Sequence, residues 1–180
     1  MHTLPNYLTF LRLLLIPVVV VLFLLPTSWG KAAATLAFAL AGLTDYLDGY
    51  LARRLGQSTA FGAFIDPVAD KITVAAALVV LIHDYHNLWV TLPALVIISR
   101  EILVSALREW MAEVGERATV AVSVIGKWKT MLQMLAIGGL LWQLAPAMVQ
   151  LAIGLLVLAA LLTLWSMISY LRAAWPILQR

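Results

Sequence analysis

Residues 44–53 read TDYLDGYLAR, and residues 62–70 read GAFIDPVAD. Together these segments place four aspartates in otherwise apolar stretches: Asp45, Asp48, Asp66 and Asp70. The first two are three residues apart and the last two are four apart, so each pair lies on one face of a helix. The connection between the two segments is short and contains glycine and polar residues, which favours a tight turn. We therefore expect two helices whose acidic faces meet.

The composition indicates that these helices lie in a membrane. Of 180 residues, 63% are hydrophobic and only 12% are charged, far from the balance of soluble proteins. A membrane-spanning helix needs about 20 apolar residues, so the chain has room for about six spans. We expect an all-α, polytopic membrane protein with one domain, residues 1–180. The expected spans lie near residues 7–25, 32–52, 67–83, 88–108, 127–144 and 147–170. The first apolar run lacks a cleavage site, so we interpret it as retained rather than as a signal peptide.

The basic residues predict the orientation of the spans. An even number of spans places both termini on one side, and cytoplasmic loops carry an excess of Lys and Arg. With cytoplasmic termini, only Lys31 falls outside. Ten basic residues then lie at or near the cytoplasmic ends: Arg12, Arg53, Arg54, Arg100, Arg108, Arg117, Lys127, Lys129, Arg172 and Arg180. The four aspartates fall at the same, cytoplasmic interface.

Four carboxylates in apolar helices need a compensating charge. Each aspartate at the centre of a membrane costs about 2.5–3.5 kcal/mol even on insertion scales. Oxygen ligands without neighbouring His or Cys favour magnesium, manganese or calcium over zinc, and two such ions would balance four carboxylates. The chain has no cysteine, which excludes disulfides and thiolate chemistry.

A purely structural alternative is that the aspartates form salt bridges with Arg53, Arg54 and Lys71 and fix the two helix ends. That alternative does not explain the small residues Gly49 and Ala52, which follow the first acidic pair. Small side chains there would leave a groove beside the acidic face, wide enough for a flat ring.

The pattern resembles the signature of the CDP-alcohol phosphotransferase family, which reads DxxDGxxAR, eight residues, then GxxxDxxxD. Every specified position is matched, by Asp45, Asp48, Gly49, Ala52, Arg53, Gly62, Asp66 and Asp70. Three further stretches are similar to the family branch that uses sn-glycerol 3-phosphate: PNYLTFLR, SREILVSALREWMAEVGERATVAVS and GKWKT.

The resemblance implies a site at the membrane surface. The four aspartates would bind two metal ions, Mg²⁺ or Mn²⁺, which hold the diphosphate of CDP-diacylglycerol, and Asp70 would also be the general base. The physical chemistry agrees, because phosphoryl transfer needs charge neutralisation, an in-line nucleophile and a proton acceptor. Residues expected to contact the CDP moiety are Gly49, Ala52, Arg53, Thr59, Asn6 and Thr9.

The acceptor implied by the branch, sn-glycerol 3-phosphate, requires cations beside the metal site. The candidates are Arg108, Lys127, Lys129 and Arg172. An isolated Lys or Arg at an interface more often extends its charge towards water, so the alternative role for each is an ordinary interfacial residue. The family also implies a homodimer in membrane lipid, and a short cysteine-free chain is typical of a bacterial inner (cytoplasmic) membrane protein.

Other functions remain open from the residues alone. The same chemistry could use inositol phosphate, serine or phosphatidylglycerol as acceptor. Intramembrane prenyltransferases also use paired aspartates and magnesium, but usually with more spans and wider spacing. A transporter is less compatible, because the acidic residues gather at one interface instead of crossing the bilayer. The tryptophans lie mostly near span ends and fit interfacial anchors, so no nucleic-acid partner is expected.

Overall fold

The computed structural model describes residues 4–55, 60–115 and 124–178. Within this part the protein is entirely helical and contains no strand. The helices are α1 (Leu4–Leu24), α2 (Gly30–Leu55), α3 (Ala60–Tyr85), α4 (Leu88–Glu113), α5 (Val124–Trp142) and α6 (Pro146–Leu178). The all-α prediction is therefore confirmed, and the described residues form six helices, one for each of the six expected spans.

The observed helices are mostly longer than the apolar runs from which we predicted them. The third helix begins at Ala60 and contains Pro67, where the sequence suggested that the span would begin. The fourth continues to Glu113, beyond the expected end at residue 108. Hydropathy locates the apolar centre of a helix, whereas backbone hydrogen bonding continues into the polar residues on either side.

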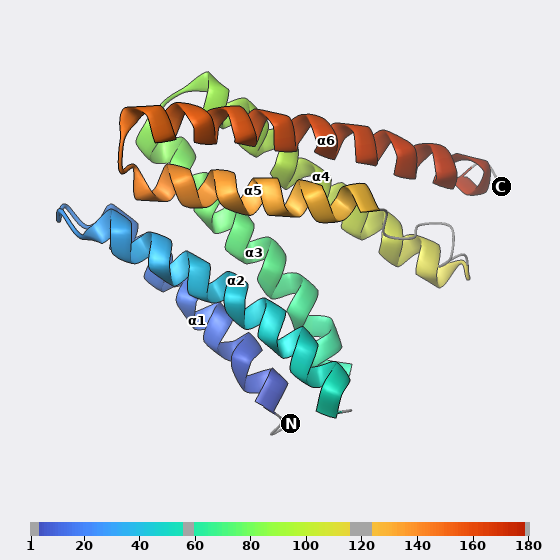
Figure 1. The fold of residues 1–180 in the computed structure, drawn as a ribbon. Coiled ribbons are helices and arrows are strands. Elements are labelled where there is room, and N and C mark those ends of the chain that lie inside the picture. Colours follow the sequence, from blue (N-terminus) through green and yellow to red (C-terminus); the bar gives the residue numbers. More distant parts are fainter. Residues whose placement is uncertain (1–3, 56–59, 116–123, 179–180) are drawn as a thin grey trace.

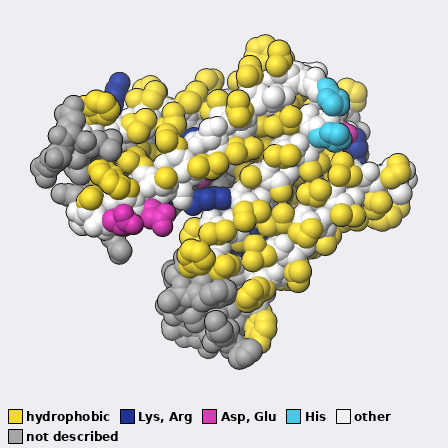
Figure 2. Space-filling model, turned by 180° about the vertical axis from the view of Figure 1, so that it is seen from behind, with side chains coloured by type: hydrophobic (Ala, Val, Ile, Leu, Met, Phe, Trp, Pro, Cys, Tyr) yellow, Lys and Arg dark blue, Asp and Glu magenta, His cyan; other side chains and the backbone are white. Residues whose placement is uncertain are grey.

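Among the helices that the structure describes, three of the six are long and apolar enough to cross a membrane, over Tyr7–Leu24, Leu88–Glu113 and Pro146–Arg172. The surface supports the same conclusion, because many large hydrophobic side chains on it are exposed, including Leu14, Leu36 and Trp165. Figure 2 shows that hydrophobic side chains cover most of one face, with acidic and basic side chains confined to small areas. Monomeric soluble proteins rarely expose apolar surface on this scale, so the helices belong in lipid.

The helices form two closely packed antiparallel pairs, α1 with α2 and α5 with α6 (Figure 1). Helix α3 contacts α1, α4 and α5, and α4 packs along α6. A single core cluster contains buried apolar residues from all six helices, among them Phe23, Phe38 and Leu78. Several of its members are alanines, which let helix backbones approach closely in a membrane.

A polar contact fixes one end of the bundle. Lys31 Nζ at the start of α2 lies 2.5 Å from Gln143 Oε1 and 3.3 Å from Asp84 Oδ2. Gln143 Nε2 in turn donates to Asp84 at 2.6 Å. Asp84 lies 14 residues after Asp70 on α3, a distance of about 21 Å at the usual rise per residue. This contact is therefore far from the four aspartates, which lie towards the opposite end.

Candidate active site

The centre of the acidic site is Arg12, on α1. Its side chain is only 1% exposed, and its guanidinium faces three carboxylates at once. Nη1 lies 3.0 Å from Asp45 Oδ1 and 2.5 Å from Asp70 Oδ1, and Nη2 contacts Asp48 Oδ2. Helices α1, α2 and α3 thus meet through one cation and three anions. The two acidic faces predicted from the spacing are brought together here.

The fourth aspartate is held separately. Thr9 Oγ1 donates a hydrogen bond of 2.6 Å to Asp66 Oδ1. Thr9 precedes Arg12 by three residues, so both side chains lie on one face of α1. This face of the first helix therefore contacts both acidic pairs.

The carboxylates differ in their access to the surroundings. Asp48 is buried, with 4% of its side chain exposed, whereas Asp45 and Asp70 are each 48% exposed. Arg12, Asp45 and Asp70 line a pocket of about 210 Å³. Asp70 also lines a second pocket of about 170 Å³, together with Lys71, Val74, Glu101, Thr130 and Gln133. A group that reaches two pockets from a half-exposed position is well placed for chemistry between two bound molecules.

The donor set fits a hard divalent cation, because it consists of carboxylate oxygens with no nitrogen or sulfur ligand. Among the described residues, however, no three acidic or histidine side chains stand in an arrangement that could hold a metal ion. Instead, the guanidinium of Arg12 contacts one oxygen of each of Asp45, Asp48 and Asp70. A metal ion bound beside these carboxylates would lie close to the positive charge of Arg12, which contacts one oxygen of each of them.

Of the three cations considered from the sequence as salt-bridge partners, Arg54 and Lys71 do not pair with the aspartates, and the side chain of Arg53 is not described. Arg54 donates to Tyr50 Oη at 3.1 Å, and Lys71 donates to Ser105 Oγ. From the sequence, Arg12 was used only to predict the orientation of the spans, and its role as the counterion of the aspartates was missed. The available signal was an arginine inside an apolar run, three residues after a threonine.

One of the expected acceptor cations, Lys129, has a partner on a neighbouring helix. Lys129 on α5 is buried and donates to Glu101 Oε1 at 2.7 Å. Arg100 contacts the same Glu101 oxygen at 2.9 Å and donates to Ser166 at 3.1 Å. Helices α4, α5 and α6 are therefore joined by a buried ionic network that includes one acceptor candidate.

Arg108 and Arg172 are exposed. Arg108 donates to Tyr170 Oη at 3.1 Å, and its guanidinium lies 5.3 Å from the centre of the Tyr170 ring. Arg172 lines a shallow pocket with Ile168, Leu171 and Trp175 on α6.

Several predicted site residues are not described in their side chains or immediate surroundings. Thr59 lies outside the described residues. The side chains and surroundings of five further residues, which lie within described helices, are not described: Asn6, Gly49, Ala52, Arg53 and Lys127. Thr9 is the expected CDP-contacting residue whose side chain is described.

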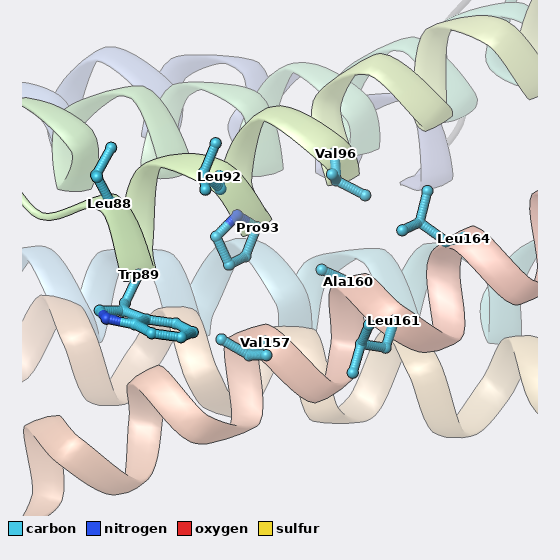
Figure 3. A pocket seen from close by; sticks show the side chains of 9 residues that line it. All are labelled: Leu88, Trp89, Leu92, Pro93, Val96, Val157, Ala160, Leu161 and Leu164. Carbon is cyan, nitrogen blue, oxygen red and sulfur yellow. The ribbon is translucent and has the colours of Figure 1, made fainter.

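Another pocket, of about 390 Å³, lies between α4 and α6 (Figure 3). Its lining is hydrophobic, with Trp89, Pro93, Val96 and Leu164 among the residues that surround it. No carboxylate, amine or hydroxyl lines it. Its chemistry suits hydrocarbon rather than a charged substrate.

Comparisons with known proteins identify a family that this chain resembles along most of its length. Residues 2–168 match the family model described as CDP-alcohol phosphatidyltransferase. A Haemophilus influenzae protein is named CDP-diacylglycerol–glycerol-3-phosphate 3-phosphatidyltransferase. It is 57% identical over 170 residues, which cover 94% of this chain and 92% of the Haemophilus influenzae protein. A protein of the same name from Escherichia coli K12 is 55% identical over 170 residues, which cover 94% of this chain and 93% of the Escherichia coli protein.

Proposed function

The chain belongs to the CDP-alcohol phosphatidyltransferase family, and we propose that it transfers the phosphatidyl group of CDP-diacylglycerol to sn-glycerol 3-phosphate. The products are phosphatidylglycerol phosphate and CMP, and the chain is thus a transferase of phospholipid biosynthesis. The identity of the acceptor rests on the names of the relatives, which are 55–57% identical over most of the chain. The whole chain, residues 1–180, forms one catalytic domain.

The observation that carries the proposal is the convergence of Asp45, Asp48 and Asp70 from two helices on one point, with Asp70 half exposed beside two pockets. Acidic residues that merely stabilised the fold would be expected to be fully paired and buried in an apolar bundle. Two of these carboxylates instead remain accessible to small molecules.

The residues that would hold divalent ions, two Mg²⁺ or Mn²⁺, are Asp45, Asp48, Asp66 and Asp70. When bound, such ions would neutralise the diphosphate and so favour displacement at phosphorus. Arg12 supplies a fixed positive charge at the same place, and it holds three of the carboxylates in position. Thr9 orients the fourth, Asp66.

Asp70 is the general base of the proposed mechanism. Its carboxylate takes the proton from the C1 hydroxyl of sn-glycerol 3-phosphate while that oxygen attacks the phosphorus that carries diacylglycerol. The bond from this phosphorus to the CMP oxygen breaks, and CMP leaves. One direct displacement predicts inversion at phosphorus, whereas retention would require a covalent phosphatidyl-enzyme.

The remaining predicted contacts complete the two substrate sites. Residues proposed for the CDP moiety are Asn6, Thr9, Gly49, Ala52, Arg53 and Thr59. Residues proposed for the acceptor phosphate are Arg108, Lys127, Lys129 and Arg172. Among those whose side chains are described, Arg108 and Arg172 are exposed and accessible to a phosphate, whereas buried Lys129 is engaged with Glu101.

The proposed setting is the bacterial inner membrane. The protein would cross it several times as a homodimer, with both termini and the active site on the cytoplasmic side. The excess of basic residues at one set of helix ends supports this orientation. A cytoplasmic site also suits a soluble, phosphorylated acceptor.

Mass spectrometry of the lipid product tests this function. Purified protein in liposomes containing CDP-diacylglycerol is supplied with Mg²⁺ and, separately, with glycerol 3-phosphate, inositol phosphate or serine. We expect phosphatidylglycerol phosphate in the first sample only. A phosphatidylinositol phosphate or phosphatidylserine product would retain the family chemistry and overturn the acceptor.

A further inference from the structure

The second pocket beside Asp70 is built from three helices. Asp70, Lys71 and Val74 come from α3, Glu101 from α4, and Thr130 and Gln133 from α5. The first pocket, which contains Arg12 and Asp45, shares Asp70, Val74 and Thr130 with it. Asp70 therefore stands at the boundary between the two.

The charged groups of the second pocket already have protein partners. Lys71 donates to Ser105 Oγ, and Glu101 accepts from both Lys129 and Arg100. These contacts fix the walls of the pocket. The pocket must then distinguish one bound molecule from another chiefly through polar groups that do not already form a hydrogen bond or ion pair within the protein.

Gln133 provides such a group. The residue is only 4% exposed, and its Oε1 is buried without a hydrogen-bond partner in the described part of the protein. A buried carbonyl oxygen without a donor is unfavourable and uncommon in folded proteins. Gln133 lies three residues after Thr130 and four after Lys129, on the α5 face that contributes to this pocket. Its oxygen is thus an acceptor available to a donor bound there.

The proposed reaction specifies what that donor would be. The attacking hydroxyl must lie against Asp70, which also lines the pocket of Gln133. In sn-glycerol 3-phosphate the neighbouring carbon carries a second hydroxyl, which does not react. An amide oxygen without a donor and a substrate hydroxyl without a reactive role are complementary.

We propose that Gln133 is a specificity residue, whose Oε1 accepts a hydrogen bond from the C2 hydroxyl of the acceptor. This proposal rests on the proposed function and goes further, because it assigns the recognition of the acceptor's polyol part to α5. A site built to bind a hydroxyl rejects an analogue that lacks it, since its buried polar group is then left unpaired.

The test compares two acceptors, sn-glycerol 3-phosphate and 3-hydroxypropyl phosphate, which lacks only the C2 hydroxyl. CMP release is measured in detergent with CDP-diacylglycerol and Mg²⁺. For the unaltered protein we expect kcat/KM to favour glycerol 3-phosphate about tenfold or more. In Gln133→Leu and Gln133→Met that preference should fall to about twofold or less, mainly through lost activity with glycerol 3-phosphate.

A matched control is Thr163→Val. Thr163 on α6 is fully buried, and its Oγ1 also lacks a partner among the described residues, but it does not line the second pocket. Its substitution should leave the preference between the two acceptors unchanged. If Thr163→Val also abolished the preference, the effect of Gln133 substitutions would be a general consequence of disturbing the bundle, and the proposal would fail.

The outcomes separate this proposal from the proposed function. Release of CMP with glycerol 3-phosphate, combined with an unchanged preference in both Gln133 variants, would overturn the role of Gln133 alone. Equal use of the two acceptors by the unaltered protein would overturn it even if neither variant folded. No CMP release with either acceptor from folded, unaltered protein would instead overturn the proposed function.

Discussion

Arg12 Nη1 lies 2.5 Å from Asp70 Oδ1, although the two residues are 58 positions apart in the sequence. The same nitrogen is 3.0 Å from Asp45, and the other terminal nitrogen contacts buried Asp48. The first helix therefore supplies the positive charge of a site whose negative charges come from the second and third. Stability and activity should both depend on this arrangement.

Replacing Arg12 by Gln should destabilise the protein. Removing one partner from a buried ion pair typically costs about 3–5 kcal/mol, because the remaining charge is left buried, here that of Asp48. Thermal unfolding in detergent measures the effect. Arg12→Lys keeps the positive charge but lacks the planar guanidinium, so its unfolding temperature should lie between those of the unaltered protein and Arg12→Gln.

Divalent ions should stabilise the Arg12→Gln variant more than they stabilise the unaltered protein. Without the guanidinium, its carboxylates would be freer to bind cations, and a ligand that binds the folded state raises its stability. Mg²⁺ should therefore raise the unfolding temperature of Arg12→Gln more than that of the unaltered protein. Equal shifts in both proteins, or unfolding of Arg12→Gln at the normal temperature, would argue against Arg12 as the counterion.

Asp70→Asn should abolish turnover while the protein remains folded. A positioned general base typically contributes about 10²- to 10⁴-fold, so CMP release should fall by at least 100-fold. Asp84→Asn is the matched control on the same helix, because Asp84 is partly exposed and contacts Lys31 and Gln143 at the other end. It should keep near-normal activity. Near-normal release from Asp70→Asn would remove this residue from the role of base.

Arg108→Leu should weaken binding of the acceptor phosphate. A hydrogen bond to a charged group contributes about 1.5–3 kcal/mol, so KM for glycerol 3-phosphate should rise about 10- to 100-fold. The KM for CDP-diacylglycerol should change little. Steady-state kinetics with each substrate varied in turn would measure both.

Arg54→Leu is a close control for that variant. Arg54 is exposed and donates to a tyrosine hydroxyl at 3.1 Å, as Arg108 does. It is not among the residues proposed for the acceptor phosphate, so its replacement should leave the KM for glycerol 3-phosphate unchanged. A similar increase in both variants would mean that loss of any exposed positive charge produces the effect.

Gly139→Ala should destabilise the contact between α5 and α6, whereas Gly138→Ala should not. A Cβ atom added at Gly139 would lie 2.9 Å from Ala152 Cβ, while one added at Gly138 meets nothing within 4 Å. Overpacking costs about 1–3 kcal/mol, and the gain in helix propensity from Gly to Ala is common to both variants. Thermal unfolding should therefore rank Gly138→Ala above Gly139→Ala. The reverse order would contradict this packing.

The sequence predicts the helices well, because apolar runs and helical spacing are local properties. The two acidic pairs could be placed on facing helices from their spacing and the short turn between them. The role of Arg12 could not be predicted from the sequence, because it depends on how α1 packs against both α2 and α3. The pairing of Lys129 with Glu101 and the burial of Gln133 likewise depend on contacts between distant helices. The predicted helix ends were also imprecise. Helix α3 begins before Pro67, the predicted start, and α4 extends through Glu113, beyond the predicted end at residue 108.

The central claim is that this protein releases CMP from CDP-diacylglycerol when glycerol 3-phosphate is the acceptor. The most direct measurement is the rate of CMP release by purified protein in detergent with Mg²⁺, with and without glycerol 3-phosphate and with and without a chelator. We predict release that requires the acceptor and stops when the chelator is added. No release from folded protein under any of these conditions, or release that the chelator leaves unchanged, would contradict the account.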